Sequence, residues 1–317
     1  MASSISSGTP SELTPSPIDS LTLLNPLVCG GNSHMWKASY KGEEVCAKVL
    51  YLTGNTSRRE ASNRTALGEL KVCASLHHKN ILPFYGYVFH ENCALILLSP
   101  LQRSGCATEF LPAHPDVDRL RLVMSILELR DPWSCSRCQQ VSEIADGVAY
   151  LHSRRIIHGD IKGRNVLVSY EDGHVRPLIC DFGSSRELDS TDSTTIVRGT
   201  LPWMAPELLR MSKSSSKITI KSDVWAWAMT VYELLTDSRP FHDTGFVGPL
   251  LVLHIASGKL PKYPGSPASE RGLGPELWDL LQRCWRFLPE DRPSSDDVTR
   301  VILELCDPFA QESTSAT

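Results

Sequence analysis

Acidic, basic and amide side chains are grouped at fixed spacing in two short segments of the chain. The first, residues 158–165, reads His-Gly-Asp-Ile-Lys-Gly-Arg-Asn, and the second begins at Asp181 and reads Asp-Phe-Gly. Transfer of a phosphoryl group needs a group that orients the acceptor hydroxyl, a cation near the transferred phosphate and oxygen ligands for Mg²⁺. Asp160 fits the first role, Lys162 the second, and Asn165 with Asp181 the third.

The first third of the chain predicts a small β-rich unit. Residues 27–50 follow the pattern strand, Gly-containing turn, strand, tight turn at Lys41-Gly42 and strand. Residues 58–76 carry apolar side chains at helical spacing, which predicts a helix. Two further apolar stretches, 81–88 and 93–98, predict strands, so we expect five strands with one helix.

Past about residue 101 the pattern becomes helical. Apolar residues recur at helical spacing in 141–152, 276–285 and 296–305, and the stretch 224–235 is almost wholly apolar. A helix that is apolar on every side belongs at the centre of a helical domain. The order of elements indicates an α+β fold, in which an antiparallel sheet with one helix precedes a mainly helical part.

Bulk composition excludes several classes of protein. The 317 residues carry a formal net charge of −4, which gives no general attraction to nucleic acid or to an anionic membrane. No apolar run approaches membrane-spanning length, and the first residues lack the basic start and apolar core of a secretory signal. Ten cysteines scattered through apolar stretches are typical of reduced thiols, so we expect a cytoplasmic or nuclear protein without membrane insertion.

The two chemistry-bearing segments resemble the catalytic loop and the metal-binding turn of a eukaryotic protein kinase. The resemblance covers residues 22–307 and implies a two-lobed kinase fold. Its five-stranded antiparallel N-lobe with one helix would occupy 22–100, and its mainly helical C-lobe 101–307. The flanking segments 1–21, rich in Ser, Thr and Pro, and 308–317 are expected to be disordered tails.

Further family motifs locate the phosphate-binding groups. Lys48, in Val-Cys-Ala-Lys, resembles the lysine of the third kinase strand, and Glu69 lies at the family's spacing for its partner. The resemblance thereby assigns catalytic roles to Asp160, Lys162, Lys48 and Glu69, and metal ligation to Asn165 and Asp181. Its nucleotide-contacting residues correspond to Gly30, Gly31, Met35, Ala47, Lys48, Leu167, Asn165 and Asp181.

Two details of the nucleotide site depart from the family or stay open. Only Gly30, the central one of the family's three loop glycines, is kept, with Gly31 beside it. Backbone amides can still bind phosphate there, but loss of the outer glycines is expected to stiffen the loop. The residue that guards the pocket, just before the Ser-Pro-Leu hinge, is either Leu97 or Leu98.

The resemblance also implies the type of kinase. Lys162 and Thr200 match residues of serine/threonine-directed kinases, which implies ATP as donor, Mg²⁺ or Mn²⁺ as cofactor and protein Ser/Thr hydroxyls as acceptors. Trp-Met-Ala-Pro-Glu, with Cys-Trp followed by Arg-Pro, most resembles the tyrosine-kinase-like group. His-Gly-Asp-Ile-Lys-Gly resembles the loop of kinases expanded in mushroom-forming fungi. The sequence does not indicate an oligomeric state.

Scaffold residues agree with this resemblance, although a second interpretation stays open. Arg292 would pair with Glu207, and Asp223 would anchor the backbone of the catalytic loop. The leading interpretation is an ATP-dependent serine/threonine kinase in intracellular signalling. The alternative is a pseudokinase, a nucleotide-binding scaffold or interaction module, which the eroded glycine loop and Gly159 favour.

Residues 123–140 interrupt a helix that the family does not interrupt. Joining Leu122 to Val141 gives one continuous apolar stripe, whereas Pro132 breaks the helix as written. The segment begins with Val and ends with Gln, whose codons can carry GT and AG, so it could be a retained intron. A genuine loop insertion is the alternative, and the sequence leaves both open.

Gly159 stands where most kinases carry the arginine that binds an activation-loop phosphate. Without that side chain, a phosphate on the loop lacks its usual partner. We therefore predict that a variant with alanine at Thr191, Ser193, Thr194 and Thr195 keeps a nearly unchanged turnover number in a phosphate-transfer assay. A large loss of turnover would contradict this prediction.

Overall fold

The computed structural model describes most of the chain. The described residues are 4–6, 15–17, 21–29, 33–52, 56–90, 94–119, 122, 143–171, 174–188, 199–210 and 217–306. Several predicted features lie outside them, namely Gly30, Gly31, residues 123–140, the four activation-loop hydroxyls at 191–195 and the 308–317 tail. In the part that is described, no helix is both long and apolar enough to cross a membrane.

Contacts between residues divide the chain into two compact units. Unit 1 contains residues 1–103 together with 181–185, and unit 2 contains 104–180 and 186–317. The Asp-Phe-Gly turn therefore belongs to unit 1 by its contacts, although the chain on both sides of it belongs to unit 2. The predicted lobe boundary at 100–101 lies close to the boundary that the contacts define.

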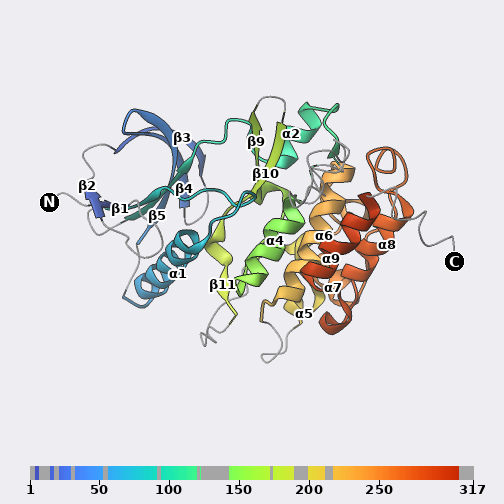
Figure 1. The fold of residues 1–317 in the computed structure, drawn as a ribbon. Coiled ribbons are helices and arrows are strands. Elements are labelled where there is room, and N and C mark those ends of the chain that lie inside the picture. Colours follow the sequence, from blue (N-terminus) through green and yellow to red (C-terminus); the bar gives the residue numbers. More distant parts are fainter. Residues whose placement is uncertain are drawn as a thin grey trace. The chain divides into compact units, whose positions relative to one another are not determined.

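Unit 1 contains the predicted five-stranded antiparallel sheet with one helix (Figure 1). These strands lie in the order β6-β7-β5-β4-β3, and α1 (Thr56–Ser75) follows β5. Lys41 and Gly42 join β4 to β5, and both have positive φ angles of 52° and 85°, as a two-residue hairpin turn requires. The strand bounds are β3 (Leu21–Cys29), β4 (Ser33–Tyr40), β5 (Glu43–Tyr51), β6 (Gly86–His90) and β7 (Ala94–Pro100).

Two short strands extend this sheet beyond the prediction. β1 (Ser4–Ser6) pairs with β6, and β2 (Pro15–Pro17) pairs with β1. The expectation that residues 1–21 form no regular structure is therefore wrong for these two segments. Without β1, one side of β6 would be an edge with unpaired backbone groups. Prolines are compatible with β2 because it is the outermost strand, where N–H groups need no partner within the sheet.

The sheet buries a different apolar cluster on each face. One cluster contains Ala38, Tyr40, Val45, Ala47, Val49, Val88, Ala94, Ile96 and Leu98. The other contains Leu50, Ala66, Leu70, Leu95 and Leu97, of which Ala66 and Leu70 come from α1. Side chains alternate along a strand, so Lys48 lies on the same face of β5 as Leu50. Helix α1 therefore covers the face that carries Lys48.

Unit 2 is mainly helical, as predicted. Its helices are α2 (Ala107–Ala113), α4 (Glu143–Ser153), α5 (Pro206–Leu209), α6 (Ile220–Thr236), α7 (Gly248–Ala256), α8 (Pro275–Cys284) and α9 (Ser295–Cys306). Two small hairpins pair β8 (Ile156–Ile157) with β11 (Arg186–Glu187), and β9 (Val166–Glu171) with β10 (His174–Ile179). Short 3₁₀ turns are η3 (Gly163–Asn165), η5 (Leu201–Trp203), η6 (His242–Thr244) and η7 (Pro289–Asp291), with η4 (Phe182–Ser184) in unit 1.

Helix α6 is the central element of unit 2. Every residue from Ser222 to Leu235 is buried, and α2, α4 and α8 pack against the helix (Figure 1). This burial explains the apolar stretch 224–235. A capping box closes the first turn, because Thr219 Oγ1 accepts from the Ser222 amide at 3.2 Å and Ser222 Oγ accepts from the Thr219 amide at 2.9 Å.

Removal of this cap should weaken unit 2. Thr219→Ala loses the oxygen that accepts from the Ser222 amide, so we expect the free energy of unfolding to fall by about 1 kcal/mol. Thr219→Ser keeps the capping oxygen and serves as the matched control. Urea unfolding followed by circular dichroism measures both, and equal losses in the two variants would contradict the assignment.

Candidate active site

A lysine of β5 lies between two carboxylates in unit 1. Lys48 Nζ donates to Glu69 Oε1 of α1 at 2.5 Å and to Asp181 Oδ1 at 2.6 Å. Burial alone would lower the pKa of Lys48, but the two carboxylates outweigh it and hold that pKa above its usual value. Lys48 therefore remains a cation. The structure brings together the predicted Lys48–Glu69 pair and adds Asp181 as a second partner of the lysine.

The Asp-Phe-Gly turn is shaped by its carboxylate and its glycine. Asp181 has a left-handed backbone with φ 65°, and its side chain is 47% exposed. A Cβ atom on Gly183 would lie 3.2 Å from Glu69 Oε2 and 3.4 Å from Asp181 Oδ1. Glycine at this position therefore leaves room for both carboxylates that hold Lys48.

The strand register separates the two candidates for the residue that guards the nucleotide pocket. Leu97 of β7 and Met35 of β4 are the cross-strand partners of Lys48. Directly opposed side chains lie on one face of a sheet, so Met35 and Leu97 share the face of Lys48. Leu98 packs in the apolar cluster of the other face. The register therefore favours Leu97 over Leu98.

The same alternation separates Ala47 from Lys48. Ala47 is fully buried in the apolar cluster on the face opposite the lysine, although it belongs to the predicted nucleotide-contacting set. Cys46, two residues before Lys48, lies on the lysine's face opposite Ser99 of β7. Burial raises the pKa of the Cys46 thiol, so this sulfur remains protonated at neutral pH.

The predicted catalytic-loop residues form a closed hydrogen-bond network in unit 2. Lys162 Nζ donates to Asp160 Oδ2 at 2.5 Å and to Thr200 Oγ1 at 2.6 Å. Thr200 in turn donates to Asp160 Oδ1, from its hydroxyl at 2.8 Å and from its amide at 2.9 Å. The network fixes the Asp160 carboxylate with a cation beside it, which is the arrangement that orientation of an acceptor hydroxyl requires.

Each unit contains one of the side chains predicted to bind a divalent cation, Asn165 in unit 2 and Asp181 in unit 1. Asn165 Nδ2 donates to the Asp160 carbonyl at 2.8 Å and to its Oδ2 at 3.2 Å, so the nitrogen is used in hydrogen bonds and the predicted ligand atom is the amide oxygen. Asp181 is exposed and directs one oxygen to Lys48. Amide and carboxylate oxygens fit Mg²⁺ and Mn²⁺. Leu167, also in the predicted nucleotide set, lies half-buried on β9 and bridges to Cys106.

Asp223 of α6 fixes the backbone at the start of the catalytic loop. Its carboxylate accepts from the His158 amide at 2.7 Å and from the Gly159 amide at 2.9 Å. His152 of α4 lies 3.1 Å from Asp223 Oδ2 through Nε2 and 2.9 Å from Ser295 Oγ through Nδ1. The predicted anchoring role of Asp223 therefore has a geometric basis. Gly159 itself has φ +78°, which a side chain would strain.

The predicted Glu207–Arg292 pair is formed and buried. Arg292 donates to both oxygens of Glu207 at 2.7 Å, and its guanidinium lies 5.0 Å from the ring centroid of Trp225. It also donates to the carbonyls of Arg286 and Lys221 at 2.8 and 3.0 Å. Each nitrogen of this buried guanidinium therefore has an acceptor, and the pair ties α5 to the chain before α9.

Glu233 of α6 is a site residue that the sequence analysis missed. Its Oε2 accepts from the Gly163 amide at 2.8 Å and from Trp203 Nε1 at 3.1 Å. Burial raises the pKa of Glu233 to about 7, although these two hydrogen bonds and the positive charge of Lys162 oppose the rise. The available signal was a single acidic residue within the apolar stretch 224–235.

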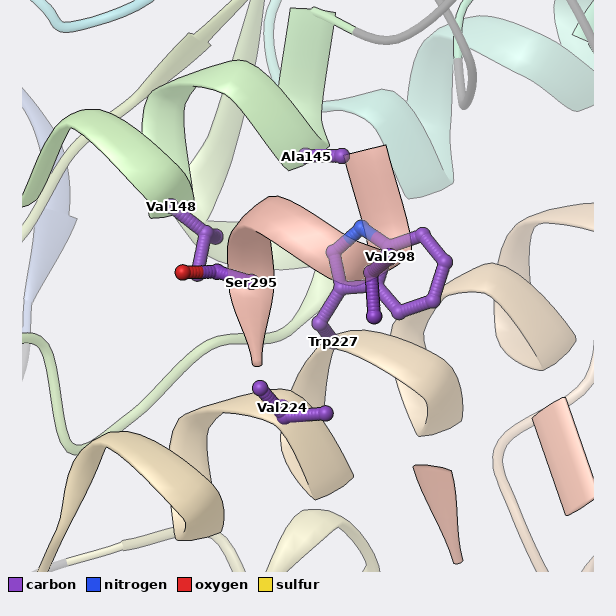
Figure 2. Close-up of a pocket in the computed structure, with 6 residues that line it drawn as sticks. All are labelled: Ala145, Val148, Val224, Trp227, Ser295 and Val298. Carbon is purple, nitrogen blue, oxygen red and sulfur yellow. The ribbon is translucent and has the colours of Figure 1, made fainter. Parts of the chain in front are cut away.

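A small apolar pocket adjoins the Asp223–His152–Ser295 contacts at Ser295. It is formed where α4, α6 and α9 meet, and Figure 2 shows the Trp227 indole nitrogen pointing toward α4. That nitrogen has no hydrogen-bond partner among the residues that the structure describes. None of the lining side chains carries a charge that could hold a phosphate. They are Ala145, Val148, Val224, Trp227, Ser295 and Val298.

The raised pKa of Glu233 predicts a pH-dependent effect of Glu233→Gln. Between pH 4.5 and about 7 the folded state binds a proton at Glu233 that the unfolded state lacks. Proton binding therefore stabilises the folded state at low pH, and this contribution to the free energy of unfolding is lost as pH rises through 7. Glutamine is neutral throughout. The variant's stability relative to wild type should therefore increase from pH 5 to pH 8, by up to about 3 kcal/mol.

Urea unfolding at pH 5, 6, 7 and 8 measures the effect. Glu304→Gln, an exposed glutamate of α9, is the matched control and should show no such trend. Parallel pH profiles for wild type and Glu233→Gln would contradict the raised pKa.

Comparison with known proteins identifies the family. A family model described as protein tyrosine and serine/threonine kinase matches residues 21–302. A probable serine/threonine-protein kinase of Dictyostelium discoideum is 30% identical over 282 residues, which cover 86% of this chain and 18% of that protein. Serine/threonine-protein kinase STY17 of Arabidopsis thaliana is 25% identical, over 90% of this chain and 44% of its own length.

Mitogen-activated protein kinase kinase kinase 12 of Rattus norvegicus is 29% identical over 88% of this chain and 27% of its own length. The chain thus spans less than half the length of each of these relatives. The family model, by contrast, covers most of the chain and includes Lys48, Asp160 and Asp181. The chain belongs to the protein tyrosine and serine/threonine kinase family.

Proposed function

We propose that this chain is the catalytic domain of a protein serine/threonine kinase, which transfers the γ-phosphate of ATP to a Ser or Thr hydroxyl. The observation that carries the proposal is the closed network of Asp160, Lys162 and Thr200. The salt-bridged Lys48 adds a cation for phosphate. These groups supply the positioning and the charge stabilisation on which phosphoryl transfer depends.

Each residue of the two networks has a chemical task. Lys48 would bind the α- and β-phosphates of ATP, and Glu69 would hold the lysine in place. Asp160 would accept the hydrogen bond of the acceptor hydroxyl and orient it, while Lys162 would neutralise charge on the transferred phosphoryl group. Asn165 and Asp181 would hold Mg²⁺ or Mn²⁺, which, when bound, neutralises phosphate charge.

The acceptor and nucleotide contacts are also part of the proposal. The bond from Lys162 to Thr200 supports Ser/Thr acceptors, because both residues match serine/threonine-directed kinases. For the nucleotide we propose Met35 and Cys46 as contacts from the sheet, together with Leu97 as the guarding residue, since all share the face of Lys48. Gly30, Gly31 and Leu167 stay predictions.

The names of the relatives support a role in intracellular signalling. Several are described as mitogen-activated protein kinase kinase kinases, which agrees with the predicted tyrosine-kinase-like group. A cytoplasmic or nuclear location belongs to the same proposal. The resemblance of the catalytic loop to kinases of mushroom-forming fungi stays a prediction.

The pseudokinase alternative has less support. A pseudokinase usually lacks one or more of the lysine, the catalytic aspartate and the metal-binding aspartate. Here Lys48, Asp160 and Asp181 are all present and hydrogen-bonded. The remaining arguments for the alternative, the missing loop glycines and Gly159, bear on affinity and control more than on the chemical step.

Phosphate transfer from ATP–Mg²⁺ to casein tests the proposed activity. Asp160→Asn should reduce the turnover number by about 10²- to 10⁴-fold, because it removes the carboxylate that orients the hydroxyl. Lys48→Met should abolish detectable transfer, whereas Lys71→Met, an exposed lysine of α1, should not. The labelled product should contain phosphoserine or phosphothreonine without phosphotyrosine. Nucleotide binding without transfer that depends on these residues would favour the pseudokinase.

A further inference from the structure

We propose that Glu233 is a positioning residue: its ionised carboxylate holds the catalytic loop and the segment after Thr200 together, and phosphoryl transfer is slower when this carboxylate is protonated. This inference rests on the proposed kinase activity. It concerns a residue outside the predicted catalytic and nucleotide-binding sets.

One oxygen joins the two segments that supply the catalytic network. Glu233 Oε2 accepts from the Gly163 amide at 2.8 Å, and Gly163 directly follows Lys162. The same oxygen accepts from Trp203 Nε1 at 3.1 Å, and Trp203 lies three residues after Thr200. The Lys162–Thr200 hydrogen bond therefore joins two segments, and Glu233 Oε2 of α6 accepts a hydrogen bond from each of them.

Close packing makes this contact sensitive to small displacements. A Cβ atom on Gly163 would lie 2.9 Å from Glu233 Oε2, 2.6 Å from Thr108 Cγ2 and 2.9 Å from Leu234 Cδ2. Only glycine allows the loop to approach α6 this closely. A change in the strength of the Gly163–Glu233 hydrogen bond is thus transmitted to Lys162, because no side chain at residue 163 holds the loop independently.

The surroundings allow Glu233 to change its charge. From the catalytic loop, Lys162 and Arg164 act on it electrostatically, and η5 contributes the neutral indole of Trp203. From α2 come Thr108 and Glu109, whose carboxylate lies 3.8 Å from Arg164 in an exposed pair. Burial raises the pKa of Glu233 to about 7. An ionised acceptor forms hydrogen bonds about twice as strong as a neutral one, so proton uptake weakens both contacts.

A spectroscopic experiment tests the contact without relying on catalysis. In ¹⁵N-glycine-labelled protein, the Gly163 amide resonance should shift with pH, with a midpoint near 7. The shift should vanish in Glu233→Gln, which keeps the acceptor oxygen without its charge. Trp203→Phe removes a hydrogen bond that lowers the pKa of Glu233, so the midpoint should move to higher pH. A Gly163 resonance that does not titrate between pH 6 and 8 would overturn the proposal.

Kinetics test the consequence for phosphoryl transfer. Turnover numbers at saturating ATP are compared between pH 6 and 8 for wild type, Glu233→Gln and the exposed-site control Glu304→Gln. As pH falls from 8 to 6, the turnover numbers of wild type and of the control should decrease about fivefold more than the turnover number of Glu233→Gln. Glu233→Gln should show little pH dependence and stay near the acidic value of wild type, with the KM for ATP unchanged.

The outcomes separate this inference from the proposed function. Equal pH profiles for wild type and Glu233→Gln would overturn the positioning role while leaving the kinase assignment intact. Absence of transfer by wild type would instead refute the kinase assignment. In that case the Gly163 titration still decides whether Glu233 holds the loop.

Discussion

A buried helix with two acidic side chains holds the catalytic loop in place. Asp223, near the start of α6, accepts the amides of His158 and Gly159, and Glu233, near its end, accepts the amide of Gly163. Backbone amides with buried carboxylate partners are costly to expose, so the loop between them has little freedom. The positions of Asp160 and Lys162 follow from this constraint, because both lie between the anchored amides. Burial of α6 on every side is therefore a requirement of the active site as much as of stability.

Sequence patterns predicted the parts of the molecule that rest on strong, local signals. Lys48, Glu69 and Asp181 were found because residue type and spacing are specific, and α6 was found because its apolar stretch has no polar face. The register at Leu97 and Leu98 could not be predicted, since two leucines in succession carry no alternation signal. β1 and β2 were missed because segments rich in Ser, Thr and Pro favour disorder, and their strands depend on pairing with β6. Helix α7 was also missed, because it begins with Gly-Pro and its nine residues are too few for a clear helical pattern.

Helix α4 begins shortly after the stretch 123–140, which is either a retained intron or a loop insertion. Near the C-terminal end of α4, His152 contacts both Asp223 and Ser295. His152 thus lies more than two turns of helix after Glu143, the first residue of α4. A helix fixed at this end can keep Asp223 in place even when its other end is altered. The contacts of His152 are therefore compatible with either origin of the stretch.

The backbone conformation of Gly159 bears on whether a phosphate on the activation loop could regulate the proposed kinase. Its φ of +78° would cost a residue with a side chain about 1–2 kcal/mol, so an arginine at this position would be strained. Glycine removes both the strain and the receptor in a single replacement. The predicted independence from an activation-loop phosphate would then follow from the backbone of one residue.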